Sequence, residues 1–199
     1  MKVKRIACLG LLLLGCSVDN LSLLILYNKA AESDCSVVGE AGLRVPSGVL
    51  DLEAGQGYVF NALVRNSVVA APADLNRHVA FIEGADVELA AASTLRSQEI
   101  VDLLGPGKNR TQYSTADVNP GGGMNVVQFF IIDPEQAQAL GEIVGADERV
   151  QILAKTRVFG TLDGDQIASP YYSYPITLCS QCIDDPKMGE PARCFGDQL

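Results

Sequence analysis

The sequence of 199 residues has no tryptophan, a single histidine and few aromatic residues, which make up 6% of the chain. The lone histidine, His78, cannot form the His-Glu-x-x-His zinc motif. The Gly-x-Ser-x-Gly elbow of hydrolases and the Gly-Lys phosphate loop are also absent. Lys and Arg form no cluster of the kind that binds nucleic acid. We therefore expect no cofactor, no metal and no nucleic-acid partner, and we expect that the protein is not an enzyme.

What the chain does have is a leader. Basic residues within the first five positions precede an apolar run from Ile6 to Gly15. This run is shorter than the roughly 20 residues that span a bilayer, and its charged start is typical of a secretory signal peptide. It ends in Leu13-Leu14-Gly15-Cys16, which resembles the lipobox of bacterial lipoproteins. The resemblance implies a signal peptide over residues 1–15 and fatty acylation of Cys16, for which palmitate is a suitable label. Several acyl chains on one residue make a stable membrane anchor.

A second interpretation joins residues Ile6 to Tyr27 into one interrupted transmembrane helix, because Leu21 to Tyr27 is apolar too. The favourable insertion energy of the apolar residues is nearly cancelled by Asp19 and its polar neighbours. The polar break at Ser17–Asn20 directly follows Cys16, and Leu21 to Tyr27 has the length of a strand. Cleavage before Cys16 is therefore the favoured interpretation.

Cleavage would also change the charge of the chain. Three of the 15 basic residues belong to the leader and all 24 acidic residues follow Cys16, so the remaining chain carries 12 minus 24, or −12. Nucleic acid and anionic lipid would repel such a protein, so we expect attachment to the membrane through acyl chains alone. We expect residues 16–20 to form the lipid-anchored N-terminus and residues 21–199 a single domain with a disulfide-bonded C-terminal segment.

Alternation of apolar and polar residues with period two predicts short strands. The clearest feature is a hairpin in which two such segments flank the turn Asp163-Gly164-Asp165. In its returning strand, Pro170 and Pro175 cannot donate ladder hydrogen bonds, so we expect this strand at a sheet edge or at a bulge. Asn125 to Ile132 is almost wholly apolar, as expected for a central strand covered on both faces. The two strands of the hairpin are Val150–Val158 and Tyr172–Leu178. Further strands are predicted at Leu21–Tyr27, Val49–Leu52, Tyr58–Arg65 and Val79–Leu89, the last with a break at Glu83-Gly84.

Two short helices are predicted between the strands. Asp133 can cap a helix that begins at Pro134, and Gln136 completes a capping box, which predicts a helix from Pro134 to about Leu140. The stretch Ala90 to Leu104 is compatible with a second helix that starts at Ser97.

The stretch Gly105 to Gly123 holds two prolines and five glycines. We therefore expect a loop here, with at most a short strand at Gln112–Ser114. Seven or eight short strands with little helix predict an all-β fold, specifically an antiparallel immunoglobulin-like β-sandwich with one or two short helices.

Four cysteines follow the proposed anchor, namely Cys35, Cys179, Cys182 and Cys194. An exported protein enters an oxidising compartment, so these cysteines predict two disulfides, for which three pairings exist. If the last strand continues as far as residue 182, its alternation places Cys179 and Cys182 on opposite faces, which favours separate partners. We therefore expect Cys35 to pair with one of these two cysteines and Cys194 with the other.

The segment Cys179-Ser180-Gln181-Cys182 also has the spacing of a redox pair or of half a zinc site. Redox pairs of this spacing lie at a helix N-terminus, where the helix dipole lowers the thiol pKa, whereas this one follows a strand. A zinc site requires a second pair or histidines. The favoured interpretation is a structural disulfide bond.

The remaining candidate sites have simple structural explanations. His78 could act as a general base, but no nucleophile is identified beside it. Asp163 and Asp165 could contact calcium, yet an Asp-Gly pair in a hairpin turn is explained by its backbone conformation. Asn109-Arg110-Thr111 matches a glycosylation acceptor, which has no role in a bacterial lipoprotein. We predict no catalytic residue.

Several features together resemble a group of uncharacterised lipoproteins of myxobacteria and their relatives. These features are the lipobox, the short apolar strand followed by Cys35, the segment from Leu50-Asp51 through Tyr58 to Asn66, and the end from Tyr174-Pro175-Ile176 to Cys179-x-x-Cys182. The resemblance covers most of the chain after Cys16 and implies a lipid-anchored sandwich without an established catalytic residue. By the same likeness, Ser17 after the lipidated cysteine implies transfer to the outer membrane.

Two hypotheses about function follow. The first is a non-enzymatic binding or structural module of the bacterial cell envelope, anchored at Cys16, whose loops bind an envelope protein or a polysaccharide. The alternative is an envelope hydrolase or a thiol-redox accessory that uses Cys179 and Cys182.

Overall fold

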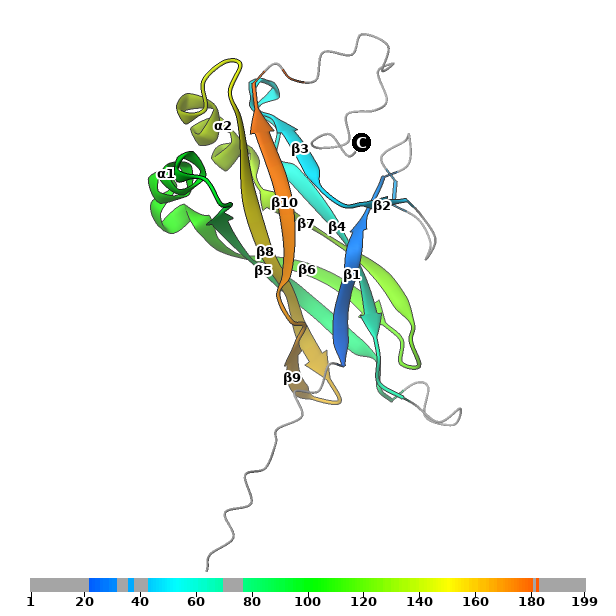
Figure 1. Cartoon of the computed structure of the whole chain (residues 1–199). Helices are drawn as coiled ribbons and strands as arrows, with labels where there is room; N and C mark the ends of the chain where they lie inside the picture. The colour runs from blue at the N-terminus through cyan, green and yellow to red at the C-terminus, as the bar shows by residue number, and fades with distance from the viewer. Residues whose placement is uncertain (1–21, 32–35, 38–42, 70–76, 181, 183–199) are drawn as a thin grey trace, which may run out of the picture.

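The computed structural model describes residues 22–31, 36–37, 43–69, 77–180 and 182. These residues form two β-sheets and two short α-helices (Figure 1), which confirms the prediction of an all-β fold with one or two helices. Within the same residues, no helix combines the length and the apolar character needed to cross a bilayer.

Sheet A has four strands among the described residues, and all of its strand pairs are antiparallel. The apolar stretch that predicted a central strand lies at the edge of this sheet, so that prediction is wrong. Its exposed Gln128 faces away from the core, which the run of apolar neighbours had obscured. In hydrogen-bonded order, sheet A consists of β2 (Arg44–Val45), β1 (Leu23–Lys29), β4 (Tyr58–Asn66) and β7 (Met124–Ile132).

Sheet B has more strands than sheet A and contains the predicted hairpin. The turn at Asp163-Gly164 has positive φ at both residues, 54° and 90°, as a two-residue type I′ hairpin turn requires. A short strand follows this turn, and the predicted returning strand comes after it. In hydrogen-bonded order, sheet B consists of β3 (Gly48–Asp51), β10 (Tyr172–Cys179), β8 (Arg149–Leu162), β5 (Ala80–Ala91) and β6 (Asn109–Val118), and β9 (Asp165–Ala168) pairs with β8.

The prediction that the strand with Pro170 and Pro175 lies at a sheet edge or at a bulge is wrong, because β10 lies between β3 and β8 and its register with β8 does not shift. β10 pairs with β8 along its whole length, whereas its parallel ladder with β3 begins only at Ile176, opposite Gly48. Pro175 therefore lies just before the second ladder begins, where a missing N–H costs least.

The prediction of a loop over Gly105 to Gly123 is wrong for most of its length. Only Gly105–Lys108 (η3) and the connection to β7 fall outside a strand, and β6 extends over ten residues, far beyond Gln112–Ser114. β6 is the edge strand of sheet B and its side chains alternate between exposed and half-buried. An edge strand with few apolar side chains carries little hydrophobic pattern, so it was not recognised from the sequence.

The expected break at Glu83-Gly84 is a β-bulge within one continuous strand. β5 runs through this point, and its register with both β6 and β8 shifts between Ile82 and Gly84. A Cβ at Gly84 would lie 2.7 Å from Cζ of Phe159, so this glycine makes room for the ring of Phe159.

The two sheets share one hydrophobic core, and a turn connects β6, an edge strand of sheet B, to β7, an edge strand of sheet A. Gln112 on β6 accepts a hydrogen bond from the backbone N–H of Phe130 (2.9 Å) and donates to the carbonyl of the same residue (2.5 Å). Asn125 of β7 donates to the carbonyl of Asp117 on β6 (3.0 Å). Side chains therefore connect the sheets where a backbone ladder does not.

A buried polar cluster bridges the sheets within the core. Asn28 on β1 donates to the hydroxyls of Tyr174 (2.9 Å) and Tyr58 (3.4 Å), and these two hydroxyls lie 2.9 Å apart. The same Asn28 accepts from the backbone N–H of Asn61 (2.9 Å). Burial raises the pKa of Tyr174, and its hydrogen bonds to Tyr58 and Asn28 partly oppose this shift. We call Asn28, Tyr58 and Tyr174 the inner cluster.

The two helices lie close to where the sequence predicted them. α2 (Pro134–Ile143) has the predicted capping box, in which Asp133 accepts from the N–H of Gln136 (2.7 Å). α1 (Leu95–Leu103) begins earlier than expected, because Thr94 and not Ser97 is its N-cap. Thr94 accepts from the N–H of Ser97, which itself lies inside the helix and is fully buried.

The alternative of one helix from Ile6 to Tyr27 is wrong for its last residues, because Leu23 to Lys29 form β1. Residues 1–21, with the leader and Cys16, lie outside the described part of the chain.

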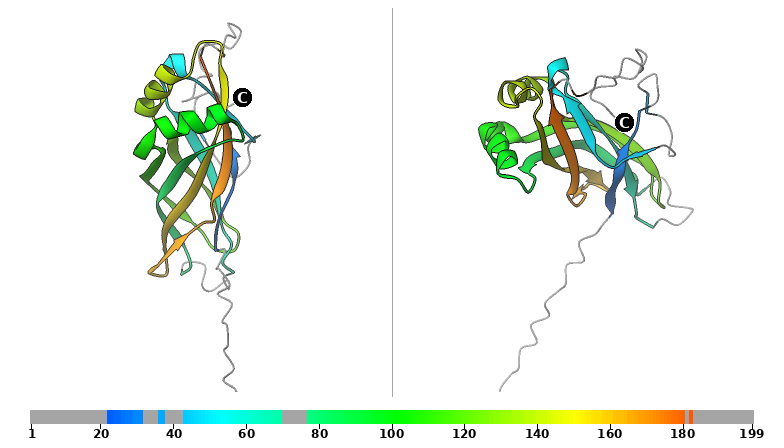
Figure 2. Two further views of the ribbon diagram at one scale, coloured as in Figure 1. Left: turned by 60° about the vertical axis from the view of Figure 1, so that its left-hand side comes forward. Right: turned by 45° about the horizontal axis from the view of Figure 1, so that its top comes forward.

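The strands give the molecule two distinct ends (Figure 1, Figure 2). One end, which we call the β9 end, carries the start of β1 and the β8–β9 hairpin. The opposite end carries both helices and the end of β10, at Cys179.

Candidate ligand-binding site

The outer face of sheet B collects four aromatic side chains. They are four of the eleven Tyr and Phe residues in the described part of the chain. Three of them are large exposed side chains, namely Phe81 (52% exposed), Tyr113 (85%) and Tyr171 (51%). The fourth, Phe159, is half-buried, and its ring lies over Gly84 of β5. Gly84 is opposite Phe159 of β8 in one ladder and opposite Tyr113 of β6 in the other.

The register of the strands places a polar row beside these aromatic residues. Asp86 on β5 is opposite Arg157 on β8 and opposite Thr111 on β6. One carboxylate oxygen of Asp86 accepts from Nε of Arg157 and lies 2.9 Å from its Nη2, and the other accepts from the hydroxyl of Thr111 (2.7 Å). The ring of Tyr171 lies over the guanidinium group, 5.0 Å from its central carbon. Each side chain of this polar row, Thr111, Asp86 and Arg157, is thus held by a contact with a neighbour.

We call these residues the outer face. They are Phe81, Asp86, Tyr113, Arg157, Phe159 and Tyr171.

Three adjoining hollows run along the outer face. The first (about 1060 Å³) and the second (about 440 Å³) share Arg157 and three residues of β9, Gln166, Ile167 and Ala168. The third (about 310 Å³) shares Asp86 with the second and Tyr171 with the first. The shared walls make one groove that crosses β9, β8, β5 and β6.

Four charged side chains of this face form two ion pairs, and Glu83 adds a carboxylate to the lining of the second hollow. Asp86 pairs with Arg157, and one row further along Lys155 lies 3.6 Å from Glu88. These four side chains are part-exposed, so each ion pair adds little to the stability of the fold. A charge that is already paired also attracts an ionic ligand only weakly.

His78 lies at the β9 end of the same groove and contacts Asp163 of the β8–β9 turn. Its Nδ1 is 2.5 Å from a carboxylate oxygen of Asp163, and both side chains are substantially exposed. Asp163 and Asp165 line the first hollow together with His78. Within the described ranges, no group of three or more His, Cys, Asp or Glu side chains could hold a metal ion. The calcium hypothesis therefore gains no support.

Among the described residues, neither Ser67 nor Ser169 is available to the His78–Asp163 pair as the nucleophile of a catalytic triad. Ser67 lines the same hollow, but its hydroxyl oxygen is buried and makes no hydrogen bond. The hydroxyl of Ser169 is bonded to the N–H of Val158 and to the carbonyl of Pro170. A base needs a nucleophile within hydrogen-bond reach, and the structure gives His78 no such contact.

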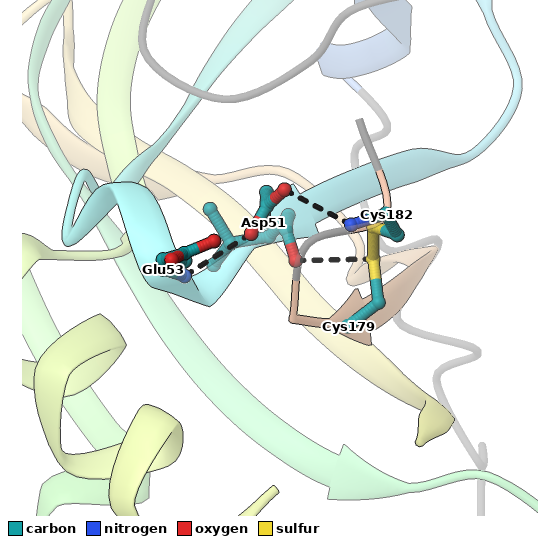
Figure 3. The surroundings of a disulfide bond; sticks show 5 residues. Asp51, Glu53, Cys179 and Cys182 are labelled. Atoms are coloured by element: carbon teal, nitrogen blue, oxygen red, sulfur yellow. Dashed lines mark hydrogen bonds between the residues drawn. A yellow bond between two sulfur atoms is a disulfide. The ribbon is translucent and has the colours of Figure 1, made fainter. Parts of the chain in front are cut away.

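The cysteine pair lies at the opposite end of the molecule, and its predicted pairing is contradicted. A disulfide joins Cys179 to Cys182, whose Cα atoms are 5.8 Å apart (Figure 3). The prediction of separate partners assumed a strand that continues through residue 182. β10 ends at Cys179, and the chain then turns so that Cys182 comes back beside it.

Neighbouring strand β3 fixes the loop that carries the disulfide. Asp51 at the end of β3 accepts a hydrogen bond from the N–H of Cys182 (3.1 Å), and Sγ of Cys179 lies 3.7 Å from the carbonyl oxygen of Leu50 (Figure 3). Asp51 also accepts from the N–H of Glu53, at the start of η1 (Leu52–Ala54). Cys179 is only 1% exposed.

The other predicted site residues divide into two groups. Cys16, Cys35 and Cys194 lie outside the described residues. Asn109 to Thr111 begin β6, where Thr111 bonds Asp86 and Arg110 pairs with Asp133 at the start of α2.

Sequence analysis did not find the outer face. Its residues come from four separate segments, and only strand register brings them together. The signal that could have pointed to it is the presence of aromatic side chains at the polar, outward positions of predicted strands, as at Phe159.

Searches against protein-family models, the curated proteins and the solved structures gave no match to this chain. The function is therefore argued from the site alone.

Proposed function

We propose that the protein is a lipid-anchored, non-enzymatic binding module of the bacterial cell envelope. The observation that carries this proposal is the outer face, where three exposed aromatic rings share one side of sheet B with hydrogen-bonded polar side chains, and where Tyr171, Asp86 and Arg157 line the groove. Exposed aromatic groups cost free energy in water and are typical of binding surfaces. An envelope protein or a polysaccharide is the partner that such a module would bind.

An immunoglobulin-like sandwich is the finer description of the fold that we infer. Strands β1, β4 and β7 follow the order A-B-E of that fold, and β10, β8, β5 and β6 follow the order G-F-C-C′. The shared core supports two facing sheets. Two features depart from the usual arrangement. α1 lies between β5 and β6, and a short turn joins β6 directly to β7.

The lipid anchor is proposed from the leader that ends at Cys16 and places the module at the outer membrane. Ser22, six residues after Cys16, lines the first hollow of the groove. Six residues of chain span at most about 20 Å. The β9 end would therefore face the membrane, and the groove would open close to its surface.

A thiol-redox accessory is the second candidate, because Cys179 and Cys182 form a disulfide across the predicted redox spacing. The surroundings favour a structural bond. Reactive cysteines are partly exposed, whereas Cys179 is buried, and the carboxylate of Asp51 accepts a hydrogen bond from the N–H of Cys182.

Two measurements test these proposals. Radiolabelled palmitate should enter the wild-type protein and not a Cys16→Ala variant, and the wild type should fractionate with the outer membrane. Label in neither protein would refute the anchor. Thiol titration of the native protein should find Cys179 and Cys182 blocked both before and after mild reductant, and ready reduction of this bond would support the redox candidate instead.

A further inference from the structure

We infer that the outer face binds a neutral polysaccharide chain, stacked on Tyr171 and Tyr113 and hydrogen-bonded to Asp86 and Arg157. This inference rests on the proposed function and names the chemical class of its ligand.

The outer face offers flat apolar surfaces next to hydrogen-bonding groups, and of the two exposed tyrosines Tyr171 lines the groove itself. Tyr113 and Tyr171 are exposed by 85% and 51%, and the polar row of Asp86 and Arg157 lies beside them. A sugar ring has the complementary surface, because its C–H groups form an apolar face and its hydroxyls around the rim both donate and accept. Aromatic rings supply large contact area at low conformational cost.

Charge balance favours a neutral ligand. The carboxylate of Asp86 is compensated by Arg157, and that of Glu88 by Lys155. An anionic polymer would meet no unpaired cation from these pairs and would be repelled by the net charge of −9. A hydroxyl can use the remaining lone pairs of Asp86 without breaking its bonds to Arg157 and Thr111.

The side chains are held in place before any ligand binds. Arg157 is fixed from one side by Asp86 and covered from the other by Tyr171, and Thr111 fixes the second oxygen of Asp86. Side chains that are already ordered lose less entropy on binding, which raises affinity.

The dimensions of the groove indicate a chain of several sugars. It crosses four neighbouring strands, β9, β8, β5 and β6, and three spacings of about 4.8 Å give a length of about 14 Å. A single sugar would cover only part of this length.

The test is native affinity electrophoresis of the full-length protein, in gels that contain one polysaccharide each. Dextran, mannan, galactan and xyloglucan serve as neutral probes, and alginate and polygalacturonate as acidic ones. We expect at least one neutral probe to retard the protein and both acidic probes to leave its mobility unchanged. Retardation by no neutral probe, or by an acidic probe alone, overturns the inference.

Variants then locate the binding site. Tyr171→Ala and Tyr113→Ala should each weaken binding about tenfold, equal to about 1.4 kcal/mol, whereas Tyr171→Phe, which keeps the ring, should bind within about twofold of wild type. The matched control is Leu103→Ala, which removes a side chain that is 60% exposed at the end of α1. Equal binding by Tyr171→Ala and wild type, or equal loss in Leu103→Ala, overturns the assignment. Circular dichroism checks that each variant is folded.

Two further outcomes separate this inference from the proposed function. If the outer face binds a purified envelope protein and no neutral glycan, the ligand class is wrong and the binding module stands. If glycan binding is found in a protein that takes up no palmitate, the anchor is wrong and the glycan site stands.

Discussion

Tyr171 and Tyr174 are three residues apart and serve opposite purposes. Tyr174 is fully buried between the sheets, where its hydroxyl is bonded to Asn28 and Tyr58. Tyr171 precedes β10, is half exposed and covers Arg157 on the outside of the same sheet. The inner cluster and the outer face thus use similar groups, and burial decides which of them stabilises the fold and which stays available to a ligand.

The comparison predicts a large loss of stability when the inner cluster is broken. Asn28→Leu removes one donor and the acceptor of the Asn61 N–H inside the core. Loss of a partner for a buried polar group costs about 1–3 kcal/mol, so we expect a total of about 3 kcal/mol. Thermal unfolding should show Tm lowered by about 10 °C. A change below about 1 kcal/mol would mean that the cluster is not coupled to folding.

The next largest effect is expected where β3 approaches the inner cluster. A Cβ at Gly48 would lie 2.6 Å from Cζ and Oη of Tyr58. Gly48→Ala should therefore cost about 1–3 kcal/mol through overpacking. Gly107→Ala is the matched control, since its Cβ would have no neighbour within 4 Å. Urea denaturation of both variants should show a loss for Gly48→Ala alone.

Tyr174→Phe should cost about 1 kcal/mol at neutral pH, the net value of one hydrogen-bonded hydroxyl. The substitution should also change how the free energy of unfolding falls at alkaline pH. Because the folded pKa of Tyr174 is raised, its contribution is complete below the usual tyrosine pKa of about 10 and is lost as the pH rises through the folded value. Urea titrations at neutral pH and at about pH 11 should show a smaller alkaline loss in the variant than in wild type. Equal losses would assign the effect to other groups.

The smallest effect on stability is expected at the outer face. Asp86→Asn weakens the pair with the part-exposed Arg157, and such pairs contribute about 1 kcal/mol or less. Denaturation should therefore find a near-native free energy of unfolding, in contrast to Asn28→Leu. A loss as large as that of Asn28→Leu would show that the outer row supports the fold, and the contrast between the two clusters would fail.

Local rules predicted the parts of the fold that depend on neighbouring residues. The capping box at Asp133 and Gln136 and the turn at Asp163-Gly164 were correct, because each is fixed by side chains within a few positions. Most of β6 was missed beyond Gln112–Ser114, since an edge strand needs no apolar alternation and its identity depends on β5 beside it.

Predictions that depended on where a strand stops were the least secure. The pairing of Cys179 and Cys182 with separate partners required β10 to continue to residue 182, and its end at Cys179 removed that condition. The edge position expected from Pro175 was also wrong, because β3 pairs with β10 from Ile176 onward and the missing N–H of Pro175 does not prevent this.

The sequence by itself determined an all-β chain, its two short helices and its hairpin turn, since these follow from periodicity, capping and backbone preference within short windows. Only the tertiary structure decided that Asp86, Arg157, Tyr113 and Tyr171 share the outer face of sheet B and that Asn28 joins Tyr58 and Tyr174. These contacts depend on the register of strands that are distant in the sequence, and a shift of one residue would send each side chain to the opposite face of its sheet.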